Sequence, residues 1–321
     1  MKAFNGKKIL LTGGTGYLAS GVVSLLLKCD CQIVRMTRQG PFGDFPKGIN
    51  EVIDLIADIR DPEIWESCLE GIDMIFHFAA QTSTYIANAD PVADHEVNVR
   101  PMLRMLEACR SLKTKPKVCF ASTVTVAGIP QTLPVGETHP DHPVTIYDLH
   151  KQMAEEYLRW YTEQGWVCGV SLRLTNIYGP GPRSSREDRG VLNQMIRRAV
   201  NTEPLTVYGT GEQLRDYLFI EDAAQACLVA AGHAEILSGE YYVIGSGVGH
   251  SISETMEIVA AKAEALTGNP VVIEHIEPPD SLSAIEQRNF VADSRKFSQL
   301  TGWKPDYQLE AGIARTMDEL L

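Results

Sequence analysis

The sequence predicts an α/β protein: a doubly wound parallel sheet covered by helices on both faces, with a smaller mixed α/β domain towards the C-terminus. Two observations predict this fold. Short apolar segments alternate with longer amphipathic segments through the first half of the chain, as in a series of β-α-β units. A glycine-rich turn joins the first apolar segment to the first amphipathic one. With 321 residues, of which 44% are hydrophobic, the chain is long enough to bury a large core.

The first half is expected to supply the strands and helices of the parallel sheet. Each expected strand is a short apolar run, and each expected helix is a longer amphipathic segment. Strands are expected at Lys8–Leu11, Gln32–Met36, Val52–Leu55, Met74–Phe78, Lys117–Ala121 and Val167–Arg173. Helices are expected at Ala19–Lys28, Pro62–Leu69, His95–Ser111 and Tyr147–Gln164. The glycine- and proline-rich segment Gln39–Gly43 is expected to be a loop.

After Asn176 the pattern becomes less regular, beginning with the turn-rich segment Pro180–Ser185. Helices are expected at Gly190–Asn201 and Asp222–Gly232, and strands at Leu205–Tyr208 and Tyr241–Ile244. The remaining α/β segments are Ile252–Gly268, Val271–Ile276 and Ser294–Gly302. We predict one domain from residues 1–175 with a returning segment at about 217–247, and a second from residues 176–216 and 248–321.

Charge and cysteine content narrow the functional class. The chain has 29 Lys and Arg against 41 Asp and Glu, a formal charge of −12, which disfavours nucleic-acid and anionic-membrane partners. No apolar stretch approaches the ~18 residues of a membrane-spanning helix. The seven cysteines lie mostly in apolar runs, so we expect free buried thiols and a cytoplasmic location. No Cys/His cluster has zinc-ligand spacing, and no metal site is expected.

The glycine-rich turn predicts a dinucleotide site of the Rossmann type. Its spacing is Gly13-x-x-Gly16-x-x-Ala19, between the first strand and the first helix. Glycines there allow a pyrophosphate to approach the backbone, and the helix N-terminus supplies free amides. An ordinary turn is the alternative. The cofactor-binding residues expected in this segment are Gly13, Thr15, Gly16, Tyr17 and Leu18.

The end of the second strand indicates which dinucleotide binds. An acidic residue at this point binds the ribose 2′-hydroxyl of NAD, but here Thr37 and Arg38 follow the strand. A guanidinium suits a 2′-phosphate, so NADP is favoured over NAD. The alternative is that Arg35 and Arg38 are only solvated surface charges. Further cofactor contacts are expected from Asp58 at the adenine, from Ile59 beside it, and from Phe78, Ala79 and Ala80 at the end of the fourth strand.

Three residues are candidates for catalysis. Tyr147 and Lys151 are four residues apart at the start of a long expected helix, so they share one helix face. A nearby ammonium lowers the pKa of a tyrosine from about 10, which allows the phenol to act as an acid or base. Lys151 can also hold the nicotinamide ribose. Thr123, at the end of the fifth strand, can hydrogen-bond the substrate oxygen beside Tyr147.

Together these segments resemble the extended short-chain dehydrogenase/reductases, in particular the nucleotide-sugar epimerase/dehydratase/reductase branch. The resemblance extends over nearly the whole chain, through Arg173–Pro180, Tyr208–Tyr217, Ala292-Asp293 and Gly302–Pro305. It implies a nucleotide-diphosphate sugar as substrate, a homodimer, and Asn98 as a further cofactor residue. The substrate-binding residues that it implies are Thr82, Ser83, Thr123, Thr125, Asn176, Arg215 and Arg288.

The expected grip on the diphosphate centres on Arg215, which we place in a loop before a strand. The alternative is that Arg215 only pairs with Asp216 or Glu212. The chain also departs from the family pattern at His150, where the family usually has a small residue. We expect a packing or helix-surface histidine there, and a role in the pocket is the alternative.

The reaction expected is hydride transfer at C4 of the sugar. Val124, Thr125 and Gly181 stand where related dehydratases, decarboxylases and fucose synthases carry acids, cysteine or histidine, so the groups for elimination or deprotonation are missing. The segment Ser122–Val126 is similar to that of UDP-galactose 4-epimerases, which favours a nucleotide-sugar 4-epimerase. Thr37 and Arg38 fit the alternative, an NADPH-dependent nucleotide-4-keto-sugar reductase. A small-molecule carbonyl reductase and a non-catalytic dinucleotide-binding protein are less favoured.

Overall fold

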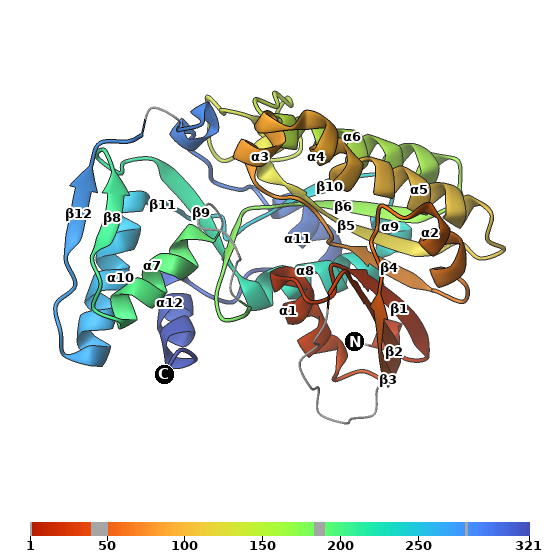
Figure 1. The fold of residues 1–321 in the computed structure, drawn as a ribbon, viewed down its shortest axis with the longest axis horizontal. Helices are drawn as coiled ribbons and strands as arrows, with labels where there is room; N and C mark the ends of the chain where they lie inside the picture. The colour runs from red at the N-terminus through yellow and green to blue at the C-terminus, as the bar shows by residue number, and fades with distance from the viewer. Residues whose placement is uncertain (1, 40–50, 183–189, 280–281) are drawn as a thin grey trace.

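A seven-stranded parallel sheet forms the larger part of the computed structural model, which describes residues 2–39, 51–182, 190–279 and 282–321 (Figure 1). The strand order is β10-β6-β5-β4-β1-β2-β3. The strands are β1 (Lys7–Thr12), β2 (Cys31–Thr37), β3 (Glu51–Ile56), β4 (Met74–His77), β5 (Lys117–Thr123), β6 (Cys168–Leu174) and β10 (Tyr241–Ile244). The order reverses between β1 and β4, and ligands of such sheets bind outside the carboxyl ends of the strands at this point. The predicted doubly wound α/β fold is confirmed.

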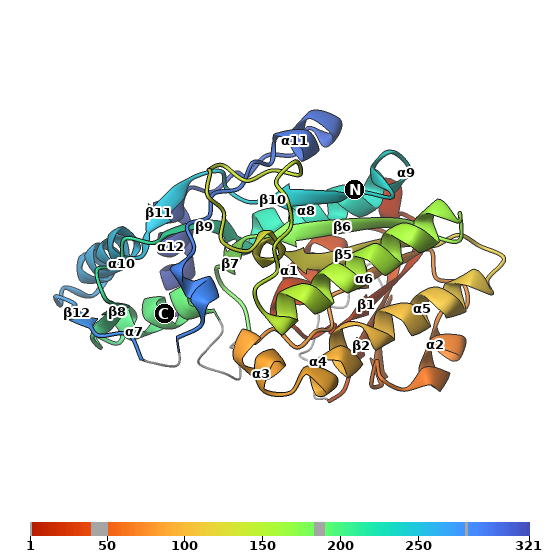
Figure 2. The ribbon, with the colours of Figure 1, turned by 90° about the horizontal axis from the view of Figure 1, so that it is seen from above.

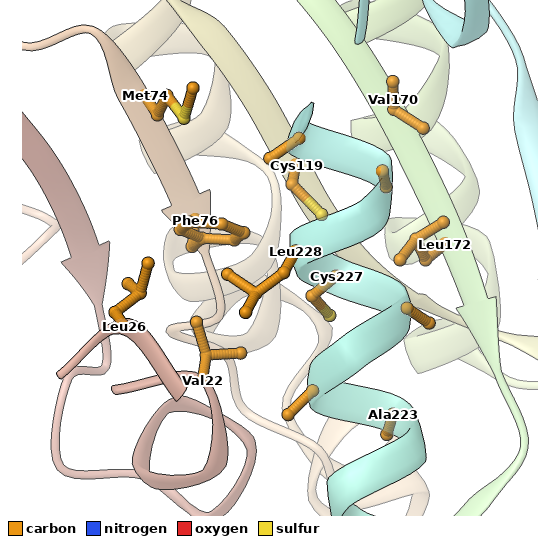
Figure 3. Close-up of a cluster of buried hydrophobic side chains, with 14 of the residues drawn as sticks. Val22, Leu26, Met74, Phe76, Cys119, Val170, Leu172, Ala223, Cys227 and Leu228 are labelled. Atoms are coloured by element: carbon orange, nitrogen blue, oxygen red, sulfur yellow. The ribbon is translucent and has the colours of Figure 1, made fainter. Parts of the chain in front are cut away.

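Helices cover both faces of this sheet, because successive strand residues point to opposite sides. Ile9 and Leu11 of β1 face one core, with α1 (Tyr17–Leu26), α8 (Ile220–Gly232), α9 (Ala234–Leu237) and α11 (Arg295–Thr301). Figure 3 shows Cys227 and Leu228 of α8 facing Phe76 and Cys119 of the sheet. Leu10 faces the opposite core, with α2 (Pro62–Cys68), α5 (Arg100–Arg110) and α6 (Ile146–Glu163). Figure 2 shows α5 and α6 side by side on that face.

The smaller part of the molecule is mixed α/β, as predicted. One sheet has the order β11-β9-β7, with β7 parallel and β11 antiparallel to β9, and β8 pairs with β12. Tyr178, Phe219, Met256 and Ile313 lie in its core. Its strands are β7 (Asn176–Tyr178), β8 (Leu205–Tyr208), β9 (Leu214–Phe219), β11 (Gly249–Ser251) and β12 (Ile273–Ile276). Its helices are α7 (Val191–Val200), α10 (Ile252–Thr267) and α12 (Leu309–Asp318), with the 3-10 turn η3 (Ala284–Gln287).

Two sequence predictions about local structure are wrong. The single helix expected at His95–Ser111 is two helices, α4 (Pro91–Asn98) and α5, because Pro101 has no amide to donate to the preceding turn. Arg215 lies inside β9, not in a loop before a strand, because β7 and β11 pair with this segment from both sides. Most of the loops expected at Gln39–Gly43 and Pro180–Ser185, namely residues 40–43 and 183–185, lie outside the described residues.

The structure also contains elements that the sequence did not predict. They are the helices α3 (Thr84–Ala89), α9 and α12, the 3-10 turns η1 (Lys2–Phe4), η2 (Val124–Ala127) and η3, and the strands β7, β9 and β11. Within the described ranges, no helix is both long and apolar enough to span a membrane.

Candidate active site

The glycine-rich turn lies at the reversal point of the sheet, where β1 meets α1. Gly13 has a φ of +64°, and a Cβ there would lie 3.0 Å from the backbone of Ala79. Gly16 is the N-cap of α1, so the first amides of this helix lack helical partners. The hydroxyl of Thr15 lies 3.2 Å from that of Thr37, which joins the turn to the end of β2. The turn therefore offers amides, space and a helix N-terminus to an anionic group.

Thr12 and His77 fix the neighbouring end of β4. The Thr12 hydroxyl oxygen accepts hydrogen bonds from the amides of Phe78 and Ala79, both at 3.1 Å. Its proton is then free to be donated to Nδ1 of His77, also 3.1 Å away. His77 is 1% exposed, and burial lowers its pKa to about 3, with a smaller contribution from the charge of Lys151. A neutral His77 thus helps to hold the segment where Phe78, Ala79 and Ala80 were predicted to meet the cofactor.

At the end of β2 the two arginines have different roles. Arg35 is buried and donates two hydrogen bonds, at 2.7 and 2.8 Å, to Asp54 of β3, so it is not a solvated surface charge. Arg38 is exposed, and its charge contributes to the lowered pKa of Asp58. The main cause of that lowered pKa is Arg60, which binds the Asp58 carboxylate at 2.6 Å. Ile59 is buried, and its carbonyl accepts a hydrogen bond from Trp65.

The predicted catalytic pair lies in the first two turns of α6. A capping box begins the helix: the Thr145 hydroxyl accepts from the Asp148 amide at 3.2 Å, and the Asp148 carboxylate accepts from the Thr145 amide at 3.1 Å. Tyr147 is 8% exposed and Lys151 is 3% exposed. The hydrogen bond from Lys151 to the carbonyl of Ala121 places this part of α6 next to the carboxyl end of β5.

Lys151 is held as a buried cation about one helical turn after Tyr147. Its ammonium donates to the carbonyl of Ala121 at 2.6 Å and lies 4.1 Å from the centre of the Phe120 ring. Burial lowers the pKa of Lys151 to about 8, while the charges of Glu155 and Asp94 act in the opposite direction. Lys151 is therefore mostly protonated at neutral pH and can stabilise a nearby phenolate.

Thr123 ends β5 and begins η2. Its hydroxyl lies 2.9 Å from the hydroxyl of Thr125 and accepts from the Thr125 amide at 3.3 Å. Both side chains are partly exposed. The predicted substrate-facing hydroxyls are therefore adjacent and hydrogen-bonded to each other.

A buried polar network, which the sequence did not predict, supports the other side of α6. Asp94 of α4 binds three groups: Nδ1 of His150 at 2.7 Å, the Gln81 amide group at 2.7 Å and the Asn98 amide group at 2.9 Å. Asn98 also exchanges hydrogen bonds with the backbone of Gln81, at 2.9 and 3.1 Å. His150 is thus a buried, paired residue, as expected for a packing histidine and not for one on the helix surface. The cofactor role of Asn98 stays a prediction.

Two of the predicted substrate residues lie in the segment that Asn98 holds. Thr82 is exposed. Ser83 is 2% exposed, and its hydroxyl caps α3 by accepting from the Ile86 amide at 3.3 Å. The structure therefore gives Ser83 a structural task, and its substrate contact remains a prediction.

Arg215 and Arg288 come together in the smaller part of the molecule. The Arg215 guanidinium donates to the carbonyls of Arg288 at 2.5 Å and Glu286 at 2.8 Å, and lies 3.4 Å from the Glu286 carboxylate. Its charge partner is thus Glu286, which replaces the alternative pairing with Asp216 or Glu212. Arg288 is 6% exposed, and among the described residues its Nε atom has no hydrogen-bond partner. Burial, together with the charge of Arg215, lowers the pKa of Arg288 to about 10.

Asn176 lies on β7, beside this pair. Its amide group donates to the carbonyl of Asp216 at 3.3 Å, and it pairs with Tyr217 in the register of β7 and β9. Asn176 and Arg215 thus lie on neighbouring strands, and their convergence with Arg288 on one ligand stays a prediction.

The sequence model of the NAD dependent epimerase/dehydratase family matches residues 9–245. The chain belongs to this family. A UDP-glucose 4-epimerase of Mycolicibacterium smegmatis is 28% identical to it, over 97% of both chains. The structure is similar to that of Thermotoga maritima UDP-glucose 4-epimerase with UDP-glucose, with a TM-score of 0.85, 26% identity and 98% of both chains covered. It is also similar to Thermus thermophilus UDP-glucose 4-epimerase in complex with NAD, with a TM-score of 0.82, 30% identity and coverage of 97% and 98%.

The family's nicotinamide dinucleotide fits the residues at the carboxyl edge of the sheet. The close approach of Gly13 to Ala79 leaves no room for a side chain, which keeps the turn open to a pyrophosphate. The predicted tyrosine and lysine are both present and lie on one helix, beside β5. This member of the family is therefore an enzyme of the extended short-chain dehydrogenase/reductase type.

Buried carboxylates at Asp216 and Asp222 anchor the C-terminal segments of this family member. Asp216 accepts from the amides of Ser246, Gly247 and Ala292, at 2.8 to 3.0 Å. Asp222, at the start of α8, accepts from the amides of Asp306 and Tyr307 at 3.0 and 3.1 Å. In the sequence, Asp216 lies in the segment Tyr208–Tyr217 that resembles the family, and Asp222 begins an expected helix. Only the fold reveals which distant amides they bind.

Proposed function

We propose that this protein is a nucleotide-sugar 4-epimerase that uses NADP. The observation that carries the proposal is the placement of Tyr147 and Lys151 against the end of β5, with Val124 and Thr125 next to Thr123. Hydride and proton transfer need Tyr147, Lys151 and Thr123, whereas elimination would need an acid at position 124 or 125. The similarity to two solved UDP-glucose 4-epimerases supports the choice of C4 as the reacting carbon.

Each residue of the proposed site has a defined task. The nicotinamide supplies hydride transfer when it is bound. Tyr147 takes the proton of the C4 hydroxyl. It returns this proton after the 4-keto sugar has rotated in the site. Lys151 keeps the phenolate accessible by its positive charge and also holds the nicotinamide ribose. Thr123 hydrogen-bonds the C4 oxygen beside Tyr147.

The preference for NADP is proposed from the end of β2. Thr37 and the exposed Arg38 occupy the position at which a carboxylate would bind the ribose of NAD. Arg35, bound to Asp54, is not available for this task. The adenine is assigned to Asp58 and Ile59, and the pyrophosphate to the turn that holds Gly13, Thr15, Gly16, Tyr17 and Leu18.

The substrate diphosphate is assigned to Arg215, Arg288 and Asn176. Two adjacent buried guanidinium groups suit a diphosphate, and the Nε of Arg288, which no group in the described ranges accepts from, is a donor in need of an acceptor. We accordingly propose that residues 1–175 and 217–247 bind the cofactor, and residues 176–216 and 248–321 the substrate. Packing of α8 on α1 and pairing of β10 with β6 support this division.

A 4-keto-sugar reductase is the second candidate, and Thr37 with Arg38 is the observation that favours it. The two functions differ in what happens to the cofactor. An epimerase regenerates its cofactor in each cycle and retains it, whereas a reductase must exchange NADPH for each turnover. The protein is purified and denatured, and the released nucleotide is identified by chromatography. Tightly retained NAD(P) supports the epimerase, and an empty protein that consumes NADPH with a UDP-4-keto sugar supports the reductase.

We also propose a homodimer formed through α5 and α6. A depression on their outer face is lined by Leu103, Met153, Tyr157 and Trp160 among others, and Trp160 is 48% exposed. Aromatic and methionine side chains of this kind are typical of interface cores. The seven free cysteines fit a reducing compartment, and we place the protein in the cytoplasm.

A further inference from the structure

Two side chains from α3 and α4 bind the beginning of α6. Asn88 of α3 accepts a hydrogen bond from the Ile146 amide at 2.9 Å, and Asp94 of α4 accepts one from Nδ1 of His150 at 2.7 Å. Both of these helices pack against α6 (Figure 2). Each of the two bonded residues of α6 directly precedes one member of the proposed catalytic pair. The two contacts therefore hold the turn of α6 that carries this pair.

The carboxylate of Asp94 also holds the segment that follows β4. It accepts from the amide groups of Gln81 at 2.7 Å and Asn98 at 2.9 Å, and Asn98 in turn binds the backbone of Gln81. Gln81 directly follows Ala79 and Ala80, which are predicted to meet the cofactor. Asp94 thus joins the helix of the catalytic pair to the segment beside the proposed cofactor site.

Burial makes these bonds necessary. Asp94 is 1% exposed and His150 is 7% exposed. A carboxylate that has left water is stable only when its oxygens accept hydrogen bonds, and this requirement assigns a proton to Nδ1 of His150. The donors come from α6, from α4 and from the segment after β4. Asp94 can keep all of its bonds only while these three segments stay in one arrangement.

The contact at His150 fixes the rotation of α6 about its axis. Residues 147, 150 and 151 lie on one side of the helix, because positions three and four apart are neighbours on its surface. Lys151 is tied to β5 through the carbonyl of Ala121, at 2.6 Å, while His150 is tied to α4. Catalytic groups have to be held within about 0.5 Å of their productive positions. Two ties in different directions supply such a constraint.

We propose that Asn88, Asp94 and His150 are positioning residues, which set Tyr147 and Lys151 against the bound nicotinamide and sugar. The three residues touch neither ligand and act through the first turns of α6. The inference rests on the roles proposed for Tyr147 and Lys151, which are the same in an epimerase and in a 4-keto-sugar reductase. If the protein proves to be a reductase, the same variants are compared in that reaction.

The test compares His150→Leu, which removes the donor to Asp94, with His150→Asn, which restores a donor near the place of Nδ1. The protein is saturated with NADP, and conversion of UDP-galactose is followed. The kcat should fall about 10–10²-fold in His150→Leu, as for a catalytic group displaced by about 1 Å. The Kd of UDP, which is assigned to Arg215 and Arg288, should change by less than about twofold in calorimetry. His150→Asn should recover most of the lost kcat.

A double variant separates positioning from a general loss of folded protein. If His150 acts through the Tyr147 phenol, His150→Leu should lower the kcat of Tyr147→Phe far less than it lowers that of the wild type. A smaller amount of folded protein would reduce both by the same factor. The matched control is His233→Leu, at the exposed end of α8 on the opposite face of the sheet. It removes a contact of Nδ1 with the Val229 carbonyl at 2.9 Å and should leave kcat unchanged.

Asn88→Ala tests the other contact, and it decides the matter if His150→Leu does not fold, because Asn88 is exposed. It should lower kcat about threefold or more, whereas Asn88→Asp keeps the acceptor for the Ile146 amide and should keep the wild-type kcat. Wild-type kcat in His150→Leu, or in Asn88→Ala when His150→Leu does not fold, would overturn the inference while the proposed function stands. Equal losses in the wild-type and Tyr147→Phe backgrounds would do the same. If the wild-type protein converts no nucleotide hexose and reduces no 4-keto sugar, the proposed function fails and the inference fails with it.

Discussion

Acid should destabilise the fold through His77, and the size of the effect follows from its environment. His77 is fully enclosed between Trp65 and Phe120, with ring centroids 6.2 and 5.9 Å away, and accepts a proton only at a pKa of about 3. In the unfolded chain its pKa is about 6.5. Because the folded pKa is the lower one, the unfolded state binds more protons between these values, and stability is lost as pH falls through this range.

The loss of folding stability between pH 7 and pH 5 follows from the protonation of His77 in the unfolded and folded states. At pH 7 the unfolded histidine is mostly neutral, and at pH 5 it is almost fully protonated while the folded one is still neutral. The linkage relation then gives a loss of about 2 kcal/mol from this one residue. His77→Asn keeps an acceptor for the Thr12 hydroxyl and removes the titration.

Urea unfolding at both pH values measures the effect in the wild-type protein and in His77→Asn. The variant is expected to be less stable at pH 7, because a smaller side chain leaves a cavity between the two rings. Its further loss of stability on acidification should be smaller than that of the wild type by about 2 kcal/mol. The carboxylates that also titrate are the same in both proteins, so their contributions to the stability loss cancel in the comparison. Equal losses in both proteins would refute the assignment of His77 as a neutral buried partner of Thr12.

Three further predictions concern the proposed cofactor, substrate and dimer contacts. Arg38→Ala should weaken the binding of NADP(H) by roughly 1.5–3 kcal/mol in fluorescence titrations, because it removes one charged hydrogen bond. The binding of NAD(H) should be nearly unchanged. Tighter binding of NAD than NADP by the unmodified protein would overturn the cofactor preference. Arg215→Lys should weaken UDP binding in calorimetry, because a lysine cannot grip two phosphates with a fork of donors; unchanged affinity would remove Arg215 from the site. Trp160→Glu should convert the dimer to a monomer in light scattering, and a wild-type monomer would contradict the proposed interface.

Local sequence signals predicted the parts of the site that depend on neighbouring residues. The turn at Gly13 could be predicted because its positive φ and the approach of Ala79 both require glycine at that one position. The pairing of Tyr147 with Lys151 follows from helix geometry alone. The break between α4 and α5 was not predicted, although Pro101 marks it in the sequence.

The parts that were missed depend on contacts between distant segments. β7 and β11 have three residues each, too few for a periodic pattern, and β9 is a strand because both of them pair with it. His150 and Asp94 are 56 residues apart, and only the packing of α4 on α6 brings them together. The partners of Arg215 are Glu286 of η3 and Arg288, which follows η3, both more than 70 residues further along the chain. No local sequence pattern predicts such pairs. They form because polar groups that are buried in the fold need hydrogen-bond partners.

Conversion of UDP-galactose to UDP-glucose tests the central claim most directly. The purified protein, supplied with NADP or NAD, is incubated with UDP-galactose, and the sugars are resolved by chromatography while nicotinamide absorbance is followed. The account predicts that UDP-glucose forms with no net change in cofactor redox state. It also predicts that Tyr147→Phe lowers turnover by about 10²–10⁴-fold, the range of a lost general acid or base, while cofactor binding is kept. Net consumption of NADPH without an epimer, no turnover of any nucleotide hexose, or near-full activity in Tyr147→Phe would contradict it.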